Sequence, residues 1–74
     1  MPRLVIKPLE LERILIKHYG FYLDHQTGSH RILLNPQTKR MAVVPMHDKD
    51  LKEGTLHSIL KHAGLTKADI REHK

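Results

Sequence analysis

Apolar residues near the beginning of the chain recur at the spacing of a helix. One stripe with the spacing i, i+3, i+4 and i+7 consists of Leu11, Ile14, Leu15 and His18. Pro8 suits the first helical position, and Gly20 suits the left-handed residue that follows a helix. The pattern therefore predicts an amphipathic helix over residues 8–19.

The middle of the chain alternates apolar and polar residues in short runs. These runs, 21–26, 30–34 and 40–44, are separated by segments rich in Gly, Asn, Pro and Thr. Such segments are typical of tight turns, so the pattern predicts three antiparallel strands. Pro45 lacks a backbone donor and is expected to end the third strand.

Alternation along the strands predicts which side chains face the helices. On the first strand, Phe21 and Leu23 are expected to point inward, and Tyr22 and Asp24 outward. On the second, Arg31 favours the solvent face, which sends Ile32 and Leu34 inward. His30, two residues before Ile32, is then expected on the same inward face, at the rim of the sheet.

A second apolar stripe predicts another helix in the last third of the chain, formed by Leu56, Ile59, Leu60 and Ala63. Gly54 and Thr55 are expected to cap its beginning, and Gly64 to end it. Thr66 and Asp69 form the pattern of a capping box for a short final helical turn that carries Ile70. The polar tail after it is expected to fray.

The predicted order is thus α-β-β-β-α, followed by a short C-terminal helical turn. The economical arrangement of these elements is an α+β fold in which a three-stranded antiparallel sheet packs two helices on one face. No linker or repeat interrupts residues 1–74, so we expect a single domain. The other face of the sheet is left for solvent or a partner.

Composition narrows the function classes. Thirteen Lys and Arg against eight Asp and Glu give a formal charge of +5, which favours contact with polyanions. The chain has no cysteine, which excludes disulfides, thiolate zinc sites and cysteine nucleophiles. No apolar run approaches the roughly 20 residues of a membrane span. We expect a cytoplasmic protein without membrane association.

Seven histidines are the remaining source of chemistry, at positions 18, 25, 30, 47, 57, 62 and 73. Their spacing matches no metal-binding motif, so no metal site is expected. A serine nucleophile elbow and a phosphate-binding glycine loop are also missing. RNA cleavage remains, because RNA supplies its own 2′-hydroxyl nucleophile and needs little more than an imidazole and cations.

Several basic side chains near the two turns could serve that reaction. His25, His30 and Arg31 flank the first turn, whereas Lys39 and Arg40 follow the second turn at the opposite end of the central strand. Across the first turn, His25 and His30 could form an acid and base pair. The alternative for His25 is a solvated histidine at the end of a strand.

Five segments in a fixed order carry a resemblance to a known family. They are Gly20-Phe21, Gln26-Thr27-Gly28-Ser29-His30, Val44-Pro45-Met46-His47, Leu51-Lys52-Glu53-Gly54-Thr55-Leu56 and Ile59-Leu60-Lys61-His62-Ala63-Gly64-Leu65. Together they resemble the HicA toxin family over nearly the whole chain. The resemblance implies a fold like that of double-stranded-RNA-binding domains and a bacterial toxin that cleaves messenger RNA.

The resemblance also assigns roles. The histidine of the family's Gly-Ser-His motif falls on His30, which is the expected catalytic residue. The other roles come from the residues themselves and not from the resemblance: Gly28 is expected to shape the turn that presents the site, and the expected substrate-binding residues are His25, Ser29, Arg31 and His47. The implied partners are a HicB-type antitoxin, which would join the toxin in a hetero-oligomer, and the mRNA substrate. No cofactor is implied. Family members often carry Arg where His25 stands, and another polar residue where Arg31 stands.

Two other interpretations use the same residues. A double-stranded-RNA-binding module with this fold would recognise RNA shape and 2′-hydroxyls without cutting. An interaction element with a small core would become stable only when its antitoxin covers it.

Overall fold

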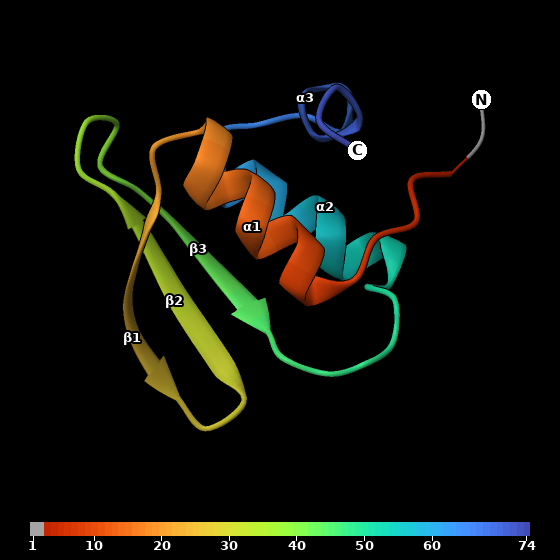
Figure 1. Cartoon of the computed structure of the whole chain (residues 1–74), viewed down its shortest axis with the longest axis horizontal. Helices are drawn as coiled ribbons and strands as arrows, with labels where there is room; N and C mark the ends of the chain where they lie inside the picture. The colour runs from red at the N-terminus through yellow and green to blue at the C-terminus, as the bar shows by residue number, and fades with distance from the viewer. Residues whose placement is uncertain (1–2) are drawn as a thin grey trace.

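The computed structural model describes residues 3–74, in which three helices and three strands follow the expected order. These elements are α1 (Pro8–His18), β1 (Tyr22–Thr27), β2 (His30–Asn35), β3 (Arg40–Pro45), α2 (Glu53–Ala63) and α3 (Lys67–Arg71). The strands form one antiparallel sheet in the order β1-β2-β3, with α1 and α2 side by side against it (Figure 1). The α+β prediction is confirmed, including the short C-terminal helix.

The apolar core lies between the helices and one face of the sheet. The sheet contributes Leu33, Ala42 and Val44, each fully buried, and these meet the apolar stripes of α1 and α2. The N-terminal segment adds Leu4 and Ile6, which no periodic pattern indicated. The carbonyl of Ile6 accepts a hydrogen bond of 2.9 Å from the Leu51 amide, which ties this segment to the loop before α2.

The pairing register shows that the predicted faces of β2 are inverted. Leu33 is fully buried, whereas Ile32 and Leu34 are only half-buried, and Arg31 shares the helix-facing parity of Leu33. His30 therefore lies on the outer face of the sheet, away from the helices. A charged residue next to three consecutive apolar ones had suggested the opposite register, but Arg31 has a buried acidic partner on the helix side.

On β1 the prediction holds in part. Phe21 is buried, and Leu23 pairs with Leu33 and so faces the helices, yet Leu23 stays 37% exposed. The cause is that β1 is the edge strand farthest from α2, so the helices cover little of it (Figure 1). A register shift between Leu23 and His25 leaves Asp24 as an extra residue, which turns His25 to the outer face.

Glycines end both main helices. Gly20 and Gly64 have φ of 76° and 77°, a left-handed conformation that side chains with a Cβ rarely adopt. The predicted cap at Gly54 and Thr55 is wrong, because α2 already begins at Glu53 and both residues lie in its first turn.

The C-terminal segment is held in place. Thr66 and Asp69 form the predicted capping box at the start of α3. The tail that was expected to fray is attached to the rest of the chain: the His73 ring stacks on His18 with centroids 3.8 Å apart, and Lys74 Nζ donates to the Val5 carbonyl at 2.6 Å. The prediction failed because it considered the tail's polarity and not the partners that packing brings to it.

Candidate functional site

The turn between β1 and β2 places His30 in solvent at the beginning of β2. Gly28 adopts a φ of 58°, and the Gln26 side-chain amide donates to the Gly28 carbonyl at 2.9 Å, which stabilises the tight turn. His30 pairs with Thr27 on one side and with Pro45 on the other. Its imidazole is exposed on the outer face of the sheet, where a large substrate has access to it.

A second histidine shares that face. His25 pairs with Ile32, one step along the sheet from the Thr27–His30 pair, so His25 and His30 are diagonal neighbours. Diagonal Cβ atoms lie about 7 Å apart, which is within the reach of two imidazole side chains toward one phosphodiester. The Nδ1 atom of His25 lies 2.7 Å from a carboxylate oxygen of Asp24, which orients the ring. The spatial proximity predicted for these two histidines is consistent with this register.

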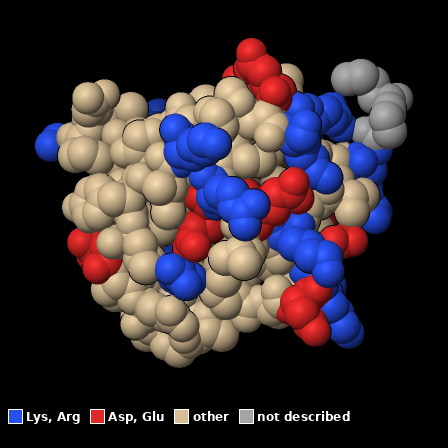
Figure 2. All heavy atoms as spheres, viewed as in Figure 1, with Lys and Arg blue, Asp and Glu red and all other residues tan. Residues whose placement is uncertain are grey.

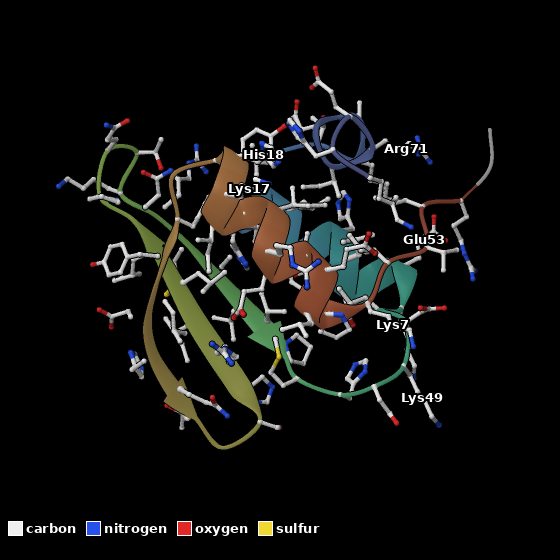
Figure 3. The ribbon with its side chains drawn as sticks, viewed as in Figure 1. Lys7, Lys17, His18, Lys49, Glu53 and Arg71 are labelled. Carbon is white, nitrogen blue, oxygen red and sulfur yellow. The ribbon has the colours of Figure 1, made fainter. Side chains whose placement is uncertain are left out.

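The loop between β3 and α2 reaches the same end of the sheet. The Met46 amide donates to the Ser29 carbonyl, so the loop starts beside the turn that presents His30. The exposed His47 follows directly and lines a surface hollow of about 440 Å³, whose other lining residues are Pro45, Lys49, Asp50, Lys52 and Thr55. Figure 3 shows Lys49 on this loop, away from the helices.

Two lysines in this hollow were missed as site residues. Lys49 and Lys52 were interpreted as part of a solvated surface, because the charged segment between β3 and α2 has no periodic pattern. The signal that was available is the end of the third strand: Pro45 pairs with His30, so the loop that follows Pro45 begins at the same end of the sheet. Asp50, in the same hollow, is the one acidic side chain among them.

Arg31 lies on the other side of β2 from His30. Its Nε atom is 2.7 Å from Glu12 Oε1 on α1, an ion-pair distance without the alignment of a hydrogen bond. The Glu12 side chain is 7% exposed and that of Arg31 is 27% exposed. A phosphate would have to compete with this buried carboxylate for the guanidinium. The phosphate-binding role of Arg31 therefore stays a prediction, and the ion pair with Glu12 argues against it.

Lys39 and Arg40 lie at the far end of the sheet from His30, as the position of the two turns predicted. Arg40 pairs with Asn35, at the opposite end of β2. Its side chain runs against the end of α2, where a Cβ added to Gly64 would come within 3.0 Å of Arg40 Nε. Neither residue joins the His30 end.

Another pair of histidines lies far from this end of the sheet. His18 ends α1 near α3 (Figure 3), and its ring stacks on that of His73 at an angle of 12°. Desolvation lowers the pKa of His18, and the charges of His73 and Lys17 act in the same direction. The lowered pKa of His18, in a ring that stacks on His73, suits a packing contact better than proton transfer.

Charged side chains gather over the helices and the N-terminal segment (Figure 2).

Among residues 3–74, no three His, Asp or Glu side chains come together in a way that could hold a metal ion. Within the same residues, no helix has the length and apolar character needed to cross a membrane.

Comparison with known families gives one match. Residues 10–65, well over half of the chain, fit the model of a family described as the HicA toxin of bacterial toxin–antitoxin systems. The matched segment contains all of α1 except its first two residues, the whole sheet and α2, and it includes every candidate site residue. A comparison with curated proteins found no match.

Proposed function

Because this chain belongs to the HicA toxin family of bacterial toxin–antitoxin systems, we propose that it is an endoribonuclease that cleaves messenger RNA and thereby inhibits translation. The observation that carries the proposal is the position of His30. An exposed imidazole stands at the end of the sheet, with a second histidine diagonal to it, and the loop that carries His47, Lys49 and Lys52 starts beside the same turn. The cytoplasm is the proposed site of action, because its substrate is translated there.

The proposed reaction uses the RNA's own nucleophile. A 2′-hydroxyl loses its proton and attacks the adjacent phosphorus, and the bond from phosphorus to the 5′-oxygen breaks, leaving a 2′,3′-cyclic phosphate and a 5′-hydroxyl. His30 takes the first proton or supplies the second, since an imidazole exists in both protonation states near neutral pH. His25 is the proposed second group, held by Asp24.

In the proposed reaction, basic side chains of the loop after β3 bind the RNA phosphates. His47, Lys49 and Lys52 come from the loop that starts beside Ser29, and charge near the reacting phosphorus stabilises the negative charge that builds in the transition state. Ser29 contributes its backbone carbonyl to the bond that positions this loop. RNA bound in this way loses affinity as salt rises. No metal ion or organic cofactor enters the proposed reaction.

The test is cleavage of a fluorescent RNA in the presence of EDTA. We expect His30→Ala to slow cleavage by about 10²- to 10⁴-fold, while affinity for RNA stays within about twofold. The matched control is His62→Ala, an exposed histidine on α2, which is expected to cut like the wild type.

Two results would contradict the proposal. If wild-type protein binds RNA but leaves it intact, the chain is a double-stranded-RNA-binding module. If His30→Ala cuts as fast as the wild type, the catalytic assignment is wrong. The proposed partner is a HicB-type antitoxin in a hetero-oligomer, so the inhibited complex should also be inactive in this assay.

A further inference from the structure

A surface hollow lies beside the turn between β2 and β3, at the opposite end of the sheet from the turn that presents His30 (Figure 1). It has a volume of about 320 Å³ and is lined by Tyr22, Leu34, Asn35, Pro36, Lys39 and Arg40. We call these six residues the turn hollow. The proposed reaction at His30 uses none of them.

Tyr22 gives the turn hollow an aromatic side chain that is open to solvent. Tyr22 pairs with Leu34, and Leu34 pairs with Met41, so these three residues share the outer face of the sheet with His30. Tyr22 is 46% exposed and Met41 is 47% exposed. Unpaired nucleobases stack on exposed aromatic side chains of this kind, because every base has a π-face.

Two cations lie beside this aromatic ring. Within residues 3–74, no hydrogen bond or ion pair holds the Lys39 ammonium, which leaves it available to an anion. The Arg40 side chain also lines the turn hollow, although it packs against Gly64 at the end of α2. No acidic side chain lines the hollow. An aromatic ring next to positive charge is the combination with which proteins bind single strands of nucleic acid.

The backbone at Lys39 is an independent observation. Lys39 has a φ of 63°, a left-handed conformation that favours glycine, and in the described part of the chain every other residue with a positive φ is a glycine. Buried Asn35 fixes the turn: its Oδ1 accepts hydrogen bonds from the amides of Gln37 and Thr38. Its carbonyl accepts another from the Lys39 amide at 2.9 Å. A strained residue held so firmly indicates a function for its side chain, since glycine would relieve the strain but remove the ammonium.

The turn hollow lies within reach of an RNA strand that is cut at His30. Four residues of β2 lead from His30 to Leu34, a distance of about 13 Å at about 3.3 Å per residue. Nucleotides of a stacked strand rise by about 3.4 Å each, so the hollow lies within about four nucleotides of the cleaved bond. Between the two ends, the outer face presents His25, Ile32 and Val43, which carry no negative charge that would repel the strand.

We propose that the turn hollow binds one nucleotide of the RNA substrate, within about four nucleotides of the cleaved bond, with the base stacked on Tyr22 and the phosphate held by Lys39. This inference rests on the proposed ribonuclease function and names a second place at which the same substrate is held. The base must be unpaired in order to stack. Because all bases stack, the subsite requires a base without specifying which one.

The experiment scans a fluorescent RNA that the wild type cuts at one bond. One nucleotide at a time is replaced by an abasic nucleotide, at each of the four positions on either side of that bond, and kcat/KM is measured in EDTA. For the wild type, we expect one position at which loss of the base lowers kcat/KM about 5- to 20-fold. Exchange of that base for any other should change kcat/KM less than about threefold.

Tyr22→Leu removes the ring and keeps an apolar side chain on β1. On intact RNA its kcat/KM should fall about 5- to 20-fold, and the abasic nucleotide should then cost less than about twofold more, because the stacking partner is already gone. Tyr22→Phe keeps the ring and should behave like the wild type. Leu9→Ala is the matched control, at a 56% exposed apolar residue on α1, and should retain the sensitivity of the wild type to the abasic nucleotide.

Lys39→Gly separates the ammonium from the backbone. Glycine takes the left-handed conformation without strain, so this variant should melt close to the wild type. The slope of the logarithm of RNA affinity against the logarithm of salt concentration should become shallower by about 0.7, the value for one phosphate contact on a single strand. Lys61→Ala removes an exposed cation from α2 and should leave the slope unchanged. Circular dichroism verifies that each variant is folded.

Other results overturn the inference. A wild type that tolerates the abasic nucleotide at every position, or Tyr22→Leu with the full sensitivity of the wild type, would exclude stacking on Tyr22. Equal salt slopes in Lys39→Gly and Lys61→Ala would exclude the phosphate contact of Lys39. Unchanged cleavage by Tyr22→Leu together with weaker antitoxin binding would assign the hollow to a protein.

Failure of the ribonuclease function itself gives a different result. A wild type that binds RNA without cutting it would refute that function. The abasic scan, read along a short RNA by fluorescence anisotropy, then tests the subsite on uncut RNA, and equal affinities of the wild type and Tyr22→Leu at every position would refute the subsite as well.

Discussion

The two faces of the sheet use the same three strands for opposite purposes. On the helix side, Leu33, Ala42 and Val44 are fully buried, and the one arginine on β2 finds a buried carboxylate. On the outer side, the residues between them along β2 and β3 remain open, and His30 is among these. Because side chains alternate along a strand, neighbouring residues of β2 face the core and the exposed surface that carries His30, the candidate catalytic residue.

The difference shows how a chain of 74 residues can present the proposed site without a deep cavity. Helix packing fixes the backbone of β2 through its inward side chains, and that same backbone sets the position of His30. The outer side chains are then free to serve binding and chemistry. Substitutions on the two faces should therefore have separable effects, and the following predictions test this.

The largest expected effect is on stability and comes from the helix side. Leu33→Ala removes a fully buried side chain and leaves a cavity, which should lower the free energy of unfolding by about 2–5 kcal/mol. Val43→Ala on the outer face, where the side chain is 38% exposed, should lower it by less than about 1 kcal/mol. Urea denaturation measures both. Equal losses would contradict the assignment of the two faces.

A smaller effect is expected at the ion pair between β2 and α1. Glu12→Ala leaves Arg31 without its carboxylate and should lower the free energy of unfolding by roughly 1–3 kcal/mol, less than for a fully buried pair because Arg31 is partly in solvent. The control is Glu10→Ala, whose carboxylate is 3.9 Å from Lys74 Nζ at the surface and should contribute below about 0.5 kcal/mol.

A double-mutant cycle with Arg31→Ala separates pairing from packing at this position. A favourable coupling energy between Glu12 and Arg31 would show that the guanidinium is held on the helix side. A coupling energy near zero would mean that Glu12 does not hold the guanidinium, and Arg31 would again be a candidate to bind the RNA phosphate. Cleavage assays on the Glu12→Ala protein add a second readout. Loss of the Glu12 carboxylate releases the Arg31 guanidinium, which should raise the affinity of the variant for RNA and so its cleavage at low RNA concentration.

The smallest effect is a pH dependence that arises away from the outer face. The pKa of His18 is lowered in the folded protein, so the unfolded chain binds more protons as the pH falls below about 6.5. The stability that depends on neutral His18 should therefore be present at neutral pH, decline as the pH falls below about 6.5, and level off once the pH is below the lowered pKa. Melting temperatures between pH 7.5 and 5 measure it.

The histidine stack is the specific cause in this prediction. His73→Ala should flatten the pH profile, since it removes both the stacked ring and its charge, whereas His62→Ala on α2 should leave the profile unchanged. A profile that keeps its slope in His73→Ala would exclude the stack as the source of the pH dependence.

Local patterns were sufficient to predict much of this fold. The stripes of α1 and α2, the glycines that end them and the capping box of α3 depend on neighbours within four residues, which the sequence displays directly. Turn-forming residues likewise located the two hairpins. His30 was singled out as the candidate catalytic residue from the motif that it shares with a family, and its role awaits the cleavage assay.

What the sequence by itself determined is therefore the order and type of the elements, because periodicity and turn chemistry are local. The tertiary structure decided which face of β2 is buried. Three consecutive apolar residues, 32–34, allow either register, and the choice depends on Glu12, which lies far away in the sequence and gives Arg31 a partner beneath α1. Packing also brought Lys49 and Lys52 into one surface hollow with Pro45, the residue that pairs with His30, and left the outer face of the sheet without a helix over it. These outcomes depend on contacts between distant segments, which no local pattern contains.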